Sequence, residues 1–210
     1  MSAHLSIDGM DELKEKLLRN NVNIAITYAE SLIGTKYSFW YPKIIVGDNE
    51  PMWVANTSAP KLTKVKSKSV NCVGLVNLMR RAVGLPVPGC NNKKVPNDTQ
   101  VPGGIHEWYK FLKKQDLLKP FDYNTQFPVG TLFLRKYVNT FDQGHVSVLY
   151  EESERGSLYS TIIHSSTNHP FAQELMFDPG VNIDNRLGQS HFFYKDGYYQ
   201  YYCLPEDWLI

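Results

Sequence analysis

The chain has 210 residues, which is long enough for one domain with a substantial hydrophobic core or for two small ones. Hydrophobic residues make up 42% of the chain and charged residues 20%, a composition typical of a folded globular protein rather than a disordered one. The formal net charge of +1 argues against a general nucleic-acid binder, which carries a strong basic excess. There is no apolar run of about 18 residues, so no membrane span is expected.

The cysteine content indicates free thiols. Cys72, Cys90 and Cys203 are too few, and odd in number, for a disulfide framework, and this usage fits a reducing compartment. Because no C-x-x-C pair occurs, a zinc ribbon is not expected. The polar residues 1–10 lack the basic-then-apolar layout of a secretory signal. We therefore expect a protein that stays inside the cell or leaves by a non-classical route, unless a leader was trimmed from the sequence.

The first half of the chain carries helical patterns. Apolar residues recur at helical steps over residues 11–34, where the pair Asn20-Asn21 is a point of division into two helices. Residues 72–83 form a second helix that ends at a glycine, and residues 105–118 form a third. Residues 37–69 are irregular and rich in turn signals, which predicts a loop or a short hairpin.

Strand patterns follow after residue 128. They cover residues 131–135, 145–150 and 158–163, and then 192–194 and 198–203 around a Lys195-Asp-Gly197 hairpin turn. Helices first and strands second predict an α+β fold with an antiparallel sheet, built as a single domain over residues 1–210.

Cys72 is the strongest candidate nucleophile. It begins a predicted helix, where unpaired backbone N–H groups and the positive end of the helix dipole stabilise a thiolate and lower its pKa. The thiolate is the reactive form of cysteine. The alternative is a buried structural cysteine, because free cysteines are among the most buried residues.

Two histidines are placed to serve that thiol. His145 begins a predicted strand, and its imidazole titrates near neutrality, so it can take the thiol proton and later protonate a leaving amine. His164 ends the next strand. If the two strands pair antiparallel, His164 lies beside His145 and can orient its ring.

Four blocks of sequence occur in order between about residues 24 and 166. They are AESLIGTKY (29–37), NCVGLV (71–76) followed by GLP (84–86), FPVGTLF (127–133), and GHVSVLY (144–150) followed by IHS (163–165). Together they resemble the NlpC/P60 family of papain-like cysteine peptidases. The resemblance implies a papain-like fold in which N-terminal helices pack on a central antiparallel sheet.

The resemblance also implies a mechanism without a cofactor. Cys72 is then the nucleophile, His145 the base, His164 the orienting residue, and Tyr37 lines the site near the oxyanion. The implied activity is thiol-dependent hydrolysis of amide bonds, as in peptidoglycan endopeptidases that cut cell-wall peptides, often beside D-glutamate. Two alternatives stay open: a non-catalytic binding or structural protein on the same fold, and a transferase that passes an acyl group through the same thioester.

Departures from the family pattern bear on the substrate. Asn71 and Val73 replace an aspartate and a serine that help family members bind a free amine, so we expect no strict recognition of such an amine. An insertion at about residues 38–68 carries aromatic residues and a basic rim that favours an acidic or extended peptide, or else it is only a covering loop. The residues concerned are Trp40, Tyr41, Trp53, Lys43, Lys61, Lys64, Lys66 and Lys68. The expected partner is a peptide-like substrate, and nothing in the sequence indicates the oligomeric state.

The remaining candidates favour structural roles. Cys90 lies in an Asn/Lys-rich loop and Cys203 in an aromatic strand that we expect in the core. His106 and His191 are interpreted as surface or capping residues. The aromatic tail, with Tyr194, Tyr198, Tyr199, Tyr201 and Tyr202, is interpreted as packed structure rather than a ligand platform. A metal site from His145, His164, His169 and His191 is not expected, because their spacing matches no zinc motif.

Overall fold

The structure of the protein, a computed structural model, describes residues 7–37, 58–66, 69–90, 103–136, 138, 144–166, 180–185, 187 and 198–210. Its helices are α1 (Ile7–Glu30), α2 (Leu62–Lys66), α3 (Cys72–Ala82), α4 (Ile105–Lys114), the 3-10 turn η1 (Ser157–Tyr159) and α6 (Pro205–Trp208). Its strands are β1 (Lys119–Pro120), β2 (Leu132–Arg135), β3 (His145–Glu151), β4 (Thr161–Ser165), β5 (Val181–Asp184) and β6 (Tyr201–Cys203). The fold is α+β, as predicted from the order of the patterns.

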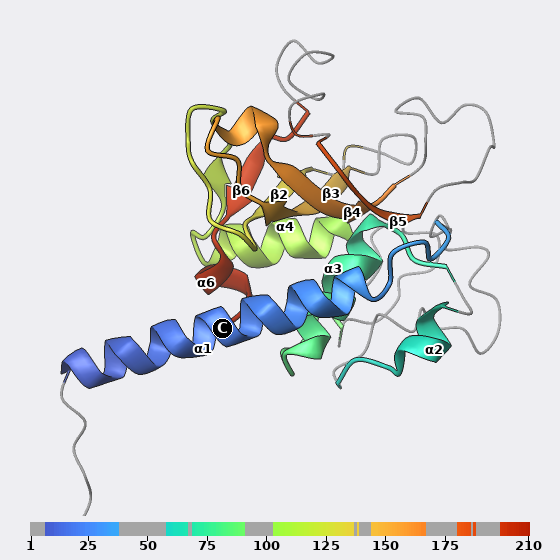
Figure 1. The fold of residues 1–210 in the computed structure, drawn as a ribbon, viewed down its shortest axis with the longest axis horizontal. Helices are drawn as coiled ribbons and strands as arrows, with labels where there is room; N and C mark the ends of the chain where they lie inside the picture. Colours follow the sequence, from blue (N-terminus) through green and yellow to red (C-terminus); the bar gives the residue numbers. More distant parts are fainter. Residues whose placement is uncertain are drawn as a thin grey trace, which may run out of the picture.

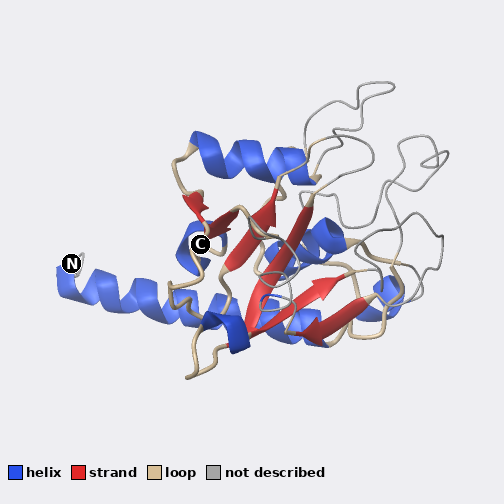
Figure 2. Cartoon of the chain, turned by 90° about the horizontal axis from the view of Figure 1, so that it is seen from above, coloured by secondary structure: helices blue, strands red, loops and turns tan. Residues whose placement is uncertain are grey.

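Within the described residues the strands form one sheet in the order β1-β6-β2-β3-β4-β5, and all neighbouring strands are antiparallel. Strands β2, β3, β4 and β5 therefore follow one another in both sequence and space. Helices α1, α3 and α4 lie along one side of this sheet (Figure 1). Viewed from above, some of the helices lie behind the strands and others lie beside them (Figure 2).

Alternation along the strands separates two buried clusters. Leu132 and Leu134 of β2 belong to the larger core that the helices share, whereas Phe133 between them belongs to a second cluster on the other side. This is the period-two pattern of a strand that is buried on both faces. The second cluster is largely aromatic and includes Phe127 and Tyr199, whose exposed fractions are 2% each. The interpretation of Tyr199 as packed structure is thus correct.

The N-terminal helix is continuous, so the predicted division at Asn20-Asn21 is wrong. Asn21 is 9% exposed, and its side-chain amide donates a 2.7 Å hydrogen bond to the carbonyl of Leu209. A tertiary contact therefore satisfies the polar group that favoured a break. Ala25 and Ala29 are fully buried in the core, and Val22 and Ile26 pack against it.

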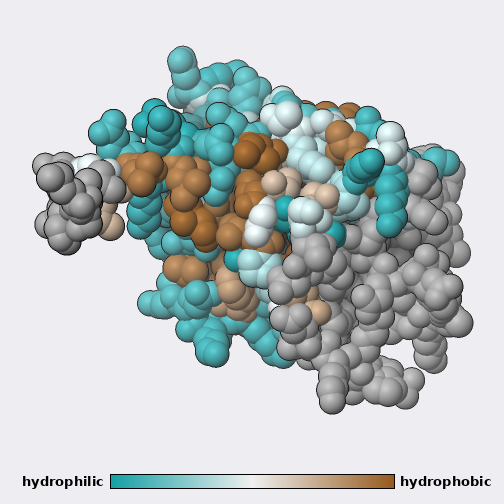
Figure 3. Space-filling view, turned by 90° about the horizontal axis from the view of Figure 1, so that it is seen from below, coloured by the Kyte–Doolittle hydropathy of each residue, from teal (hydrophilic) through white to brown (hydrophobic). Residues whose placement is uncertain are grey.

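Other large apolar residues of α1 form an exposed apolar stripe on the outer side of the helix. Figure 3 shows apolar side chains gathered along this helix. Met10, Leu13, Leu17 and Ile24 are between 40% and 61% exposed. None of the helices in the described part of the chain has the length and apolarity needed to cross a bilayer.

The predicted last strand, residues 198–203, is limited in the structure to β6 (Tyr201–Cys203). One edge of β6 pairs with β1 and the other with β2. Strand β1 is only two residues long and contains a proline, which hides it from a sequence pattern. The predicted partner strand and its turn at residues 195–197 lie outside the described residues.

Candidate functional site

The helix that begins at Cys72 starts with a side-chain cap. Asn71 has extended backbone angles, and its Oδ1 accepts a 2.7 Å hydrogen bond from the backbone N–H of Gly74. This satisfies one of the unpaired N–H groups of the first turn. Asn71, predicted as a substrate-side position, therefore has a structural role in fixing where α3 begins, and Cys72 occupies the first helical position.

The thiol of Cys72 faces the beginning of strand β3. Cys72 is 7% exposed, and the backbone of Val146, the residue after His145, hydrogen-bonds the sulfur together with the first-turn backbone of Val73 and Cys72 itself. Helix α3 packs against both β3 and β4. The structure thus brings the nucleophile candidate to the strand that carries the base candidate.

The expected fall in the pKa of Cys72 is not what the structure gives. Burial raises the pKa of the Cys72 thiol above its ordinary value, and backbone hydrogen bonds and the charge of Arg135 offset that rise only in part. The helix start alone suggested the opposite direction, because a sequence does not show how deeply the first turn is buried. The resting thiol is therefore the neutral form, and a reaction needs a base.

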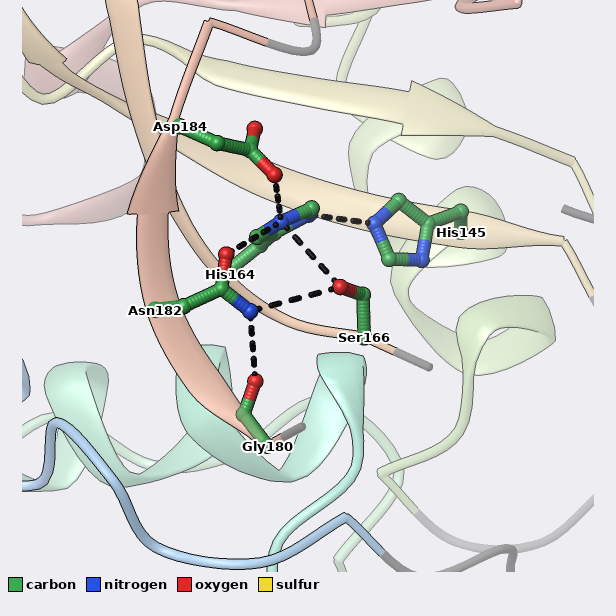
Figure 4. Close-up of polar contacts among 6 residues, drawn as sticks. All are labelled: His145, His164, Ser166, Gly180, Asn182 and Asp184. Atoms are coloured by element: carbon green, nitrogen blue, oxygen red, sulfur yellow. Dashed lines mark hydrogen bonds and ion pairs between the residues drawn. The ribbon is translucent and has the colours of Figure 1, made fainter. Parts of the chain in front are cut away.

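The two predicted histidines are directly connected. His145 Nε2 lies 3.0 Å from His164 Nδ1, and the two rings meet edge to face with centroids 5.2 Å apart. Figure 4 shows the hydrogen bond joining the start of β3 to the end of β4. The pairing of β3 with β4 is antiparallel, which is the arrangement the sequence argument required. His164 is fully buried and His145 is 6% exposed, so neither ring has much freedom to turn.

Strand β5 supplies a second layer of partners for His164. Its Nε2 lies 3.1 Å from Asp184 Oδ2 and 3.2 Å from Asn182 Oδ1, and Ser166 Oγ is at 3.3 Å (Figure 4). Asn182 pairs directly with His164 in the β4–β5 register. Sequence reasoning missed both Asn182 and Asp184. The alternation Val181-Asn-Ile-Asp184 was the available signal, because it puts both polar residues on one face of a short strand.

Backbone contacts hold the start of α3 against this layer. Val70 donates a 2.9 Å hydrogen bond to the carbonyl of Lys36, and Lys36 forms a bridge with Gly180 at the start of β5. A side chain at Gly180 would collide with the carbonyl of Thr35, so only glycine allows this approach. Tyr37, the predicted oxyanion residue, follows Lys36 and is half-buried.

Arg135 adds a positive charge beside the histidines. It pairs directly with His145 in the β2–β3 register. Its guanidinium lies 4.4 Å from the ring centroid of Tyr198, and its Nη2 donates a 3.2 Å hydrogen bond to the hydroxyl of Tyr198. The ring of Tyr198 in turn lies 5.7 Å from that of His145. The same cation acts on the Cys72 thiol, so it belongs to the electrostatics of the site.

The structure also locates several of the other residues that the sequence suggested as candidates. Val73 is 3% exposed and packs in the helix-side core, as does Cys203, which was expected there. Cys90 is half-buried, and His106 lies in the first turn of α4. His169, His191 and Tyr194 lie outside the described residues, as do 38–57 and 67–68 of the insertion. Among the residues that the structure describes, no three metal-ligating side chains gather in one place.

A shallow groove of about 520 Å³ lies elsewhere, between the C-terminal half of α1 and the start of α2. Ile24, Tyr28, Ala59 and Leu62 are among its lining residues, and neither Cys72 nor the histidines contribute to it. It is therefore not part of the candidate site.

The sequence matches no protein-family model and no curated protein.

Proposed function

We propose that the protein is a cysteine hydrolase of the papain-like NlpC/P60 type that cleaves amide bonds with Cys72, His145 and His164. The observation that carries the proposal is the 3.0 Å hydrogen bond between His145 and His164, with His145 at the start of the strand against which the Cys72 helix packs. A buried pair of histidines, one held by a second polar layer, is what an oriented general base requires. The α+β architecture, with the helix of the nucleophile packed on an antiparallel sheet, is consistent with the proposed family.

The proposed reaction uses a base because the resting thiol is neutral. His145 Nε2 is engaged by His164, so Nδ1 is the nitrogen that receives the proton of Cys72. The thiolate then attacks the substrate carbonyl, the imidazolium protonates the leaving amine, and a thioester remains on Cys72. Water, deprotonated by the same histidine, hydrolyses the thioester. First-turn backbone N–H groups of α3, which already contact the sulfur, and Tyr37 are the proposed donors to the oxyanion.

For the substrate, we propose an acidic or extended peptide. Arg135 provides a cation within the electrostatic reach of Cys72, and Lys61, Lys64 and Lys66 are exposed on and around α2. With Asn71 used as a helix cap and Val73 in the core, the two positions that bind a free amine in family members carry neither a carboxylate nor a hydroxyl. The family's cell-wall peptides are the alternative substrate.

One observation favours a different function. The Cys72 thiol is nearly inaccessible and its pKa is raised, as in a structural cysteine of a non-catalytic binding protein. A thiol-directed activity probe with an amide-like recognition element decides between the two. Selective labelling of Cys72, absent in Cys72→Ala and assigned by peptide mass spectrometry, supports the hydrolase. If the folded protein is labelled no faster at Cys72 than at Cys203, the binding protein is the better interpretation.

The substrate class requires a separate experiment. The protein and its Cys72→Ala variant are incubated with purified cell-wall fragments and with a diverse linear peptide library, and the products are identified by mass spectrometry. We expect Cys72-dependent cleavage in the library, with acidic residues enriched near the cut. Cleavage beside D-glutamate with little action on the library would return the protein to the usual role of the family. A thioester-based transferase would be revealed by products that carry an added amine in place of water.

A further inference from the structure

The polar atoms around His164 determine which of its nitrogens carries a proton. Asp184 Oδ2 and Asn182 Oδ1 both approach His164 Nε2, at 3.1 Å and 3.2 Å. The amide of Asn182 is oriented by its other end, because its Nδ2 donates a 2.8 Å hydrogen bond to the carbonyl of Gly180. Both oxygens therefore act as acceptors, and His164 Nε2 must be the N–H donor.

The tautomer of His145 follows from that of His164. With its proton on Nε2, neutral His164 has an acceptor at Nδ1, and this atom lies 3.0 Å from His145 Nε2. His145 must then donate from Nε2, which leaves the lone pair of a neutral imidazole on Nδ1. Nδ1 is the atom that the proposed reaction needs as a base. The reversed tautomers would turn the base nitrogen of His145 into a donor.

We propose that Asp184 is a positioning residue of the site, which acts through His164 to fix the tautomer of His145 and to stabilise its protonated form. The inference rests on the proposed function and deepens it. When the Cys72 proton moves to His145 Nδ1, the His145 Nε2–H and His164 Nε2–H bonds stay in place, and no proton passes to Asp184. The carboxylate contributes its charge and its acceptor oxygen.

Charge distinguishes Asp184 from Asn182. Asn182 offers the same acceptor geometry without a charge, so it can hold the tautomer but cannot stabilise an imidazolium. The titratable and charged groups that face the two rings are Arg135 on β2, Tyr198 and Tyr199 before β6, and Asp184 on β5. Arg135 is positive and disfavours protonation of His145. Asp184 is negative, contacts the His164 side of the histidine pair, and favours protonation of His145. His164 is fully buried, and the Asp184 side chain is 26% exposed, so solvent screens the carboxylate only in part.

The first test reads the tautomer directly and needs no thiol chemistry. Imidazole ¹⁵N NMR is recorded in a Cys72→Ala background, with and without Asp184→Asn. With Asp184 present, we expect neutral His145 as the Nε2–H form. In Asp184→Asn, we expect the pH midpoint of His145 to fall by about one unit, the low end of the effect of a nearby opposite charge. Asp184→Glu should restore most of it, and Asp11→Asn, which removes an exposed carboxylate on α1, should leave it unchanged. Identical His145 tautomer and midpoint with and without the Asp184 carboxylate overturn the proposal.

The second test measures the consequence for Cys72. The rate of alkylation by iodoacetamide is followed against pH in chains that retain Cys72. We expect Asp184→Asn to react about tenfold more slowly near pH 7, because His145 is then a weaker base for the thiol proton. Thermal unfolding of each variant separates this effect from loss of fold. If Asp184→Asn does not fold, Asp184→Ala replaces it, since β5 is the outermost strand in the described sheet order. If Cys72 of the parent chain does not react at all, the hydrolase proposal fails, and the NMR result still decides the role of Asp184.

Discussion

The hydroxyl of Ser165 donates a 2.6 Å hydrogen bond to the carbonyl oxygen of Val70. Ser165 follows His164 at the end of β4, and Val70 stands two residues before Cys72. The contact joins two segments that are 95 residues apart in the chain. It ties the strand of the orienting histidine to the start of the helix that bears the thiol, so it helps to set the alignment of the site.

Removing this tether should destabilise the protein and disturb the site together. Ser165 is fully buried, so Ser165→Ala leaves a buried carbonyl without its donor, which costs about 1 kcal/mol in the free energy of unfolding. Urea unfolding measures this loss, and alkylation of Cys72 measures the effect on the site. Ser31→Ala is the matched control, since Ser31 also donates to a carbonyl, at 2.8 Å, but in an exposed position. Equal losses in the free energy of unfolding of the two variants would show that the buried Ser165 hydrogen bond contributes no more than an exposed one.

The cap at Asn71 gives a second prediction. Asn71→Ala should lower the free energy of unfolding by about 1 kcal/mol, because the N–H of Gly74 loses its acceptor at the start of α3. Asn71→Asp keeps an acceptor oxygen and should retain most of the stability. It should also slow alkylation of Cys72 near neutral pH, because the added negative charge disfavours the adjacent thiolate. Faster alkylation in Asn71→Asp than in the parent chain would contradict this electrostatic argument.

His145 should control the reactivity of the thiol. Burial raises the pKa of Cys72, so at neutral pH the reaction with iodoacetamide depends on a base that takes the proton. We expect His145→Ala to slow alkylation at pH 7 on the order of tenfold, the effect of one pKa unit. His164→Ala should slow it less, because it orients the base and does not replace it. His106→Ala, on α4, is the control. Equal alkylation rates in the parent chain and His145→Ala would exclude an ion pair between the thiol and this ring.

Local patterns were sufficient for the starts of α3 and β3, but not for the strand that carries His164. That strand was predicted at residues 158–163, whereas the structure has the 3-10 turn η1 at Ser157–Tyr159 and β4 at Thr161–Ser165. Helix α3 begins at Cys72 and strand β3 at His145, as expected, because a cap precedes the one and Gly144 the other. Gly144 has a φ of 77°, a conformation that favours glycine, so the glycine itself indicates the turn into β3. The proximity of His145 to His164 could be predicted from the antiparallel pairing of their strands alone.

Long-range relationships were beyond the sequence. The acceptors of His164 lie on β5, whose register against β4 is set by pairing across the sheet rather than by any local signal. The direction of the pKa of Cys72 depends on how much protein covers the first turn of α3, which is a property of the packed structure. The pairing of β6 with the two-residue β1 also could not be predicted, because it depends on the packed sheet and not on a local pattern.

Two buried thiols should make the protein less stable at alkaline pH. Burial raises the pKa of Cys203 and of Cys72 above their ordinary values, with the nearby carboxylates of Asp207 and Glu206 adding to the rise at Cys203. Between the unfolded and folded pKa values, the unfolded chain has lost protons that the folded chain keeps. Stability is therefore fully present below about pH 8.5, the ordinary thiol pKa, and falls as the pH rises above it.

The expected slope is at most about 1.4 kcal/mol per pH unit for each thiol. Urea unfolding between pH 7 and 10 gives the free energy of unfolding at each pH. Cys203→Ala lowers stability at every pH, because it leaves a cavity in the core, but its curve should be flatter above pH 8.5. The double variant Cys72→Ala/Cys203→Ala should be flatter still. A slope in the variants as steep as in the parent chain would mean that other groups, such as the tyrosines, cause the alkaline loss and that the two thiols titrate normally in the folded protein.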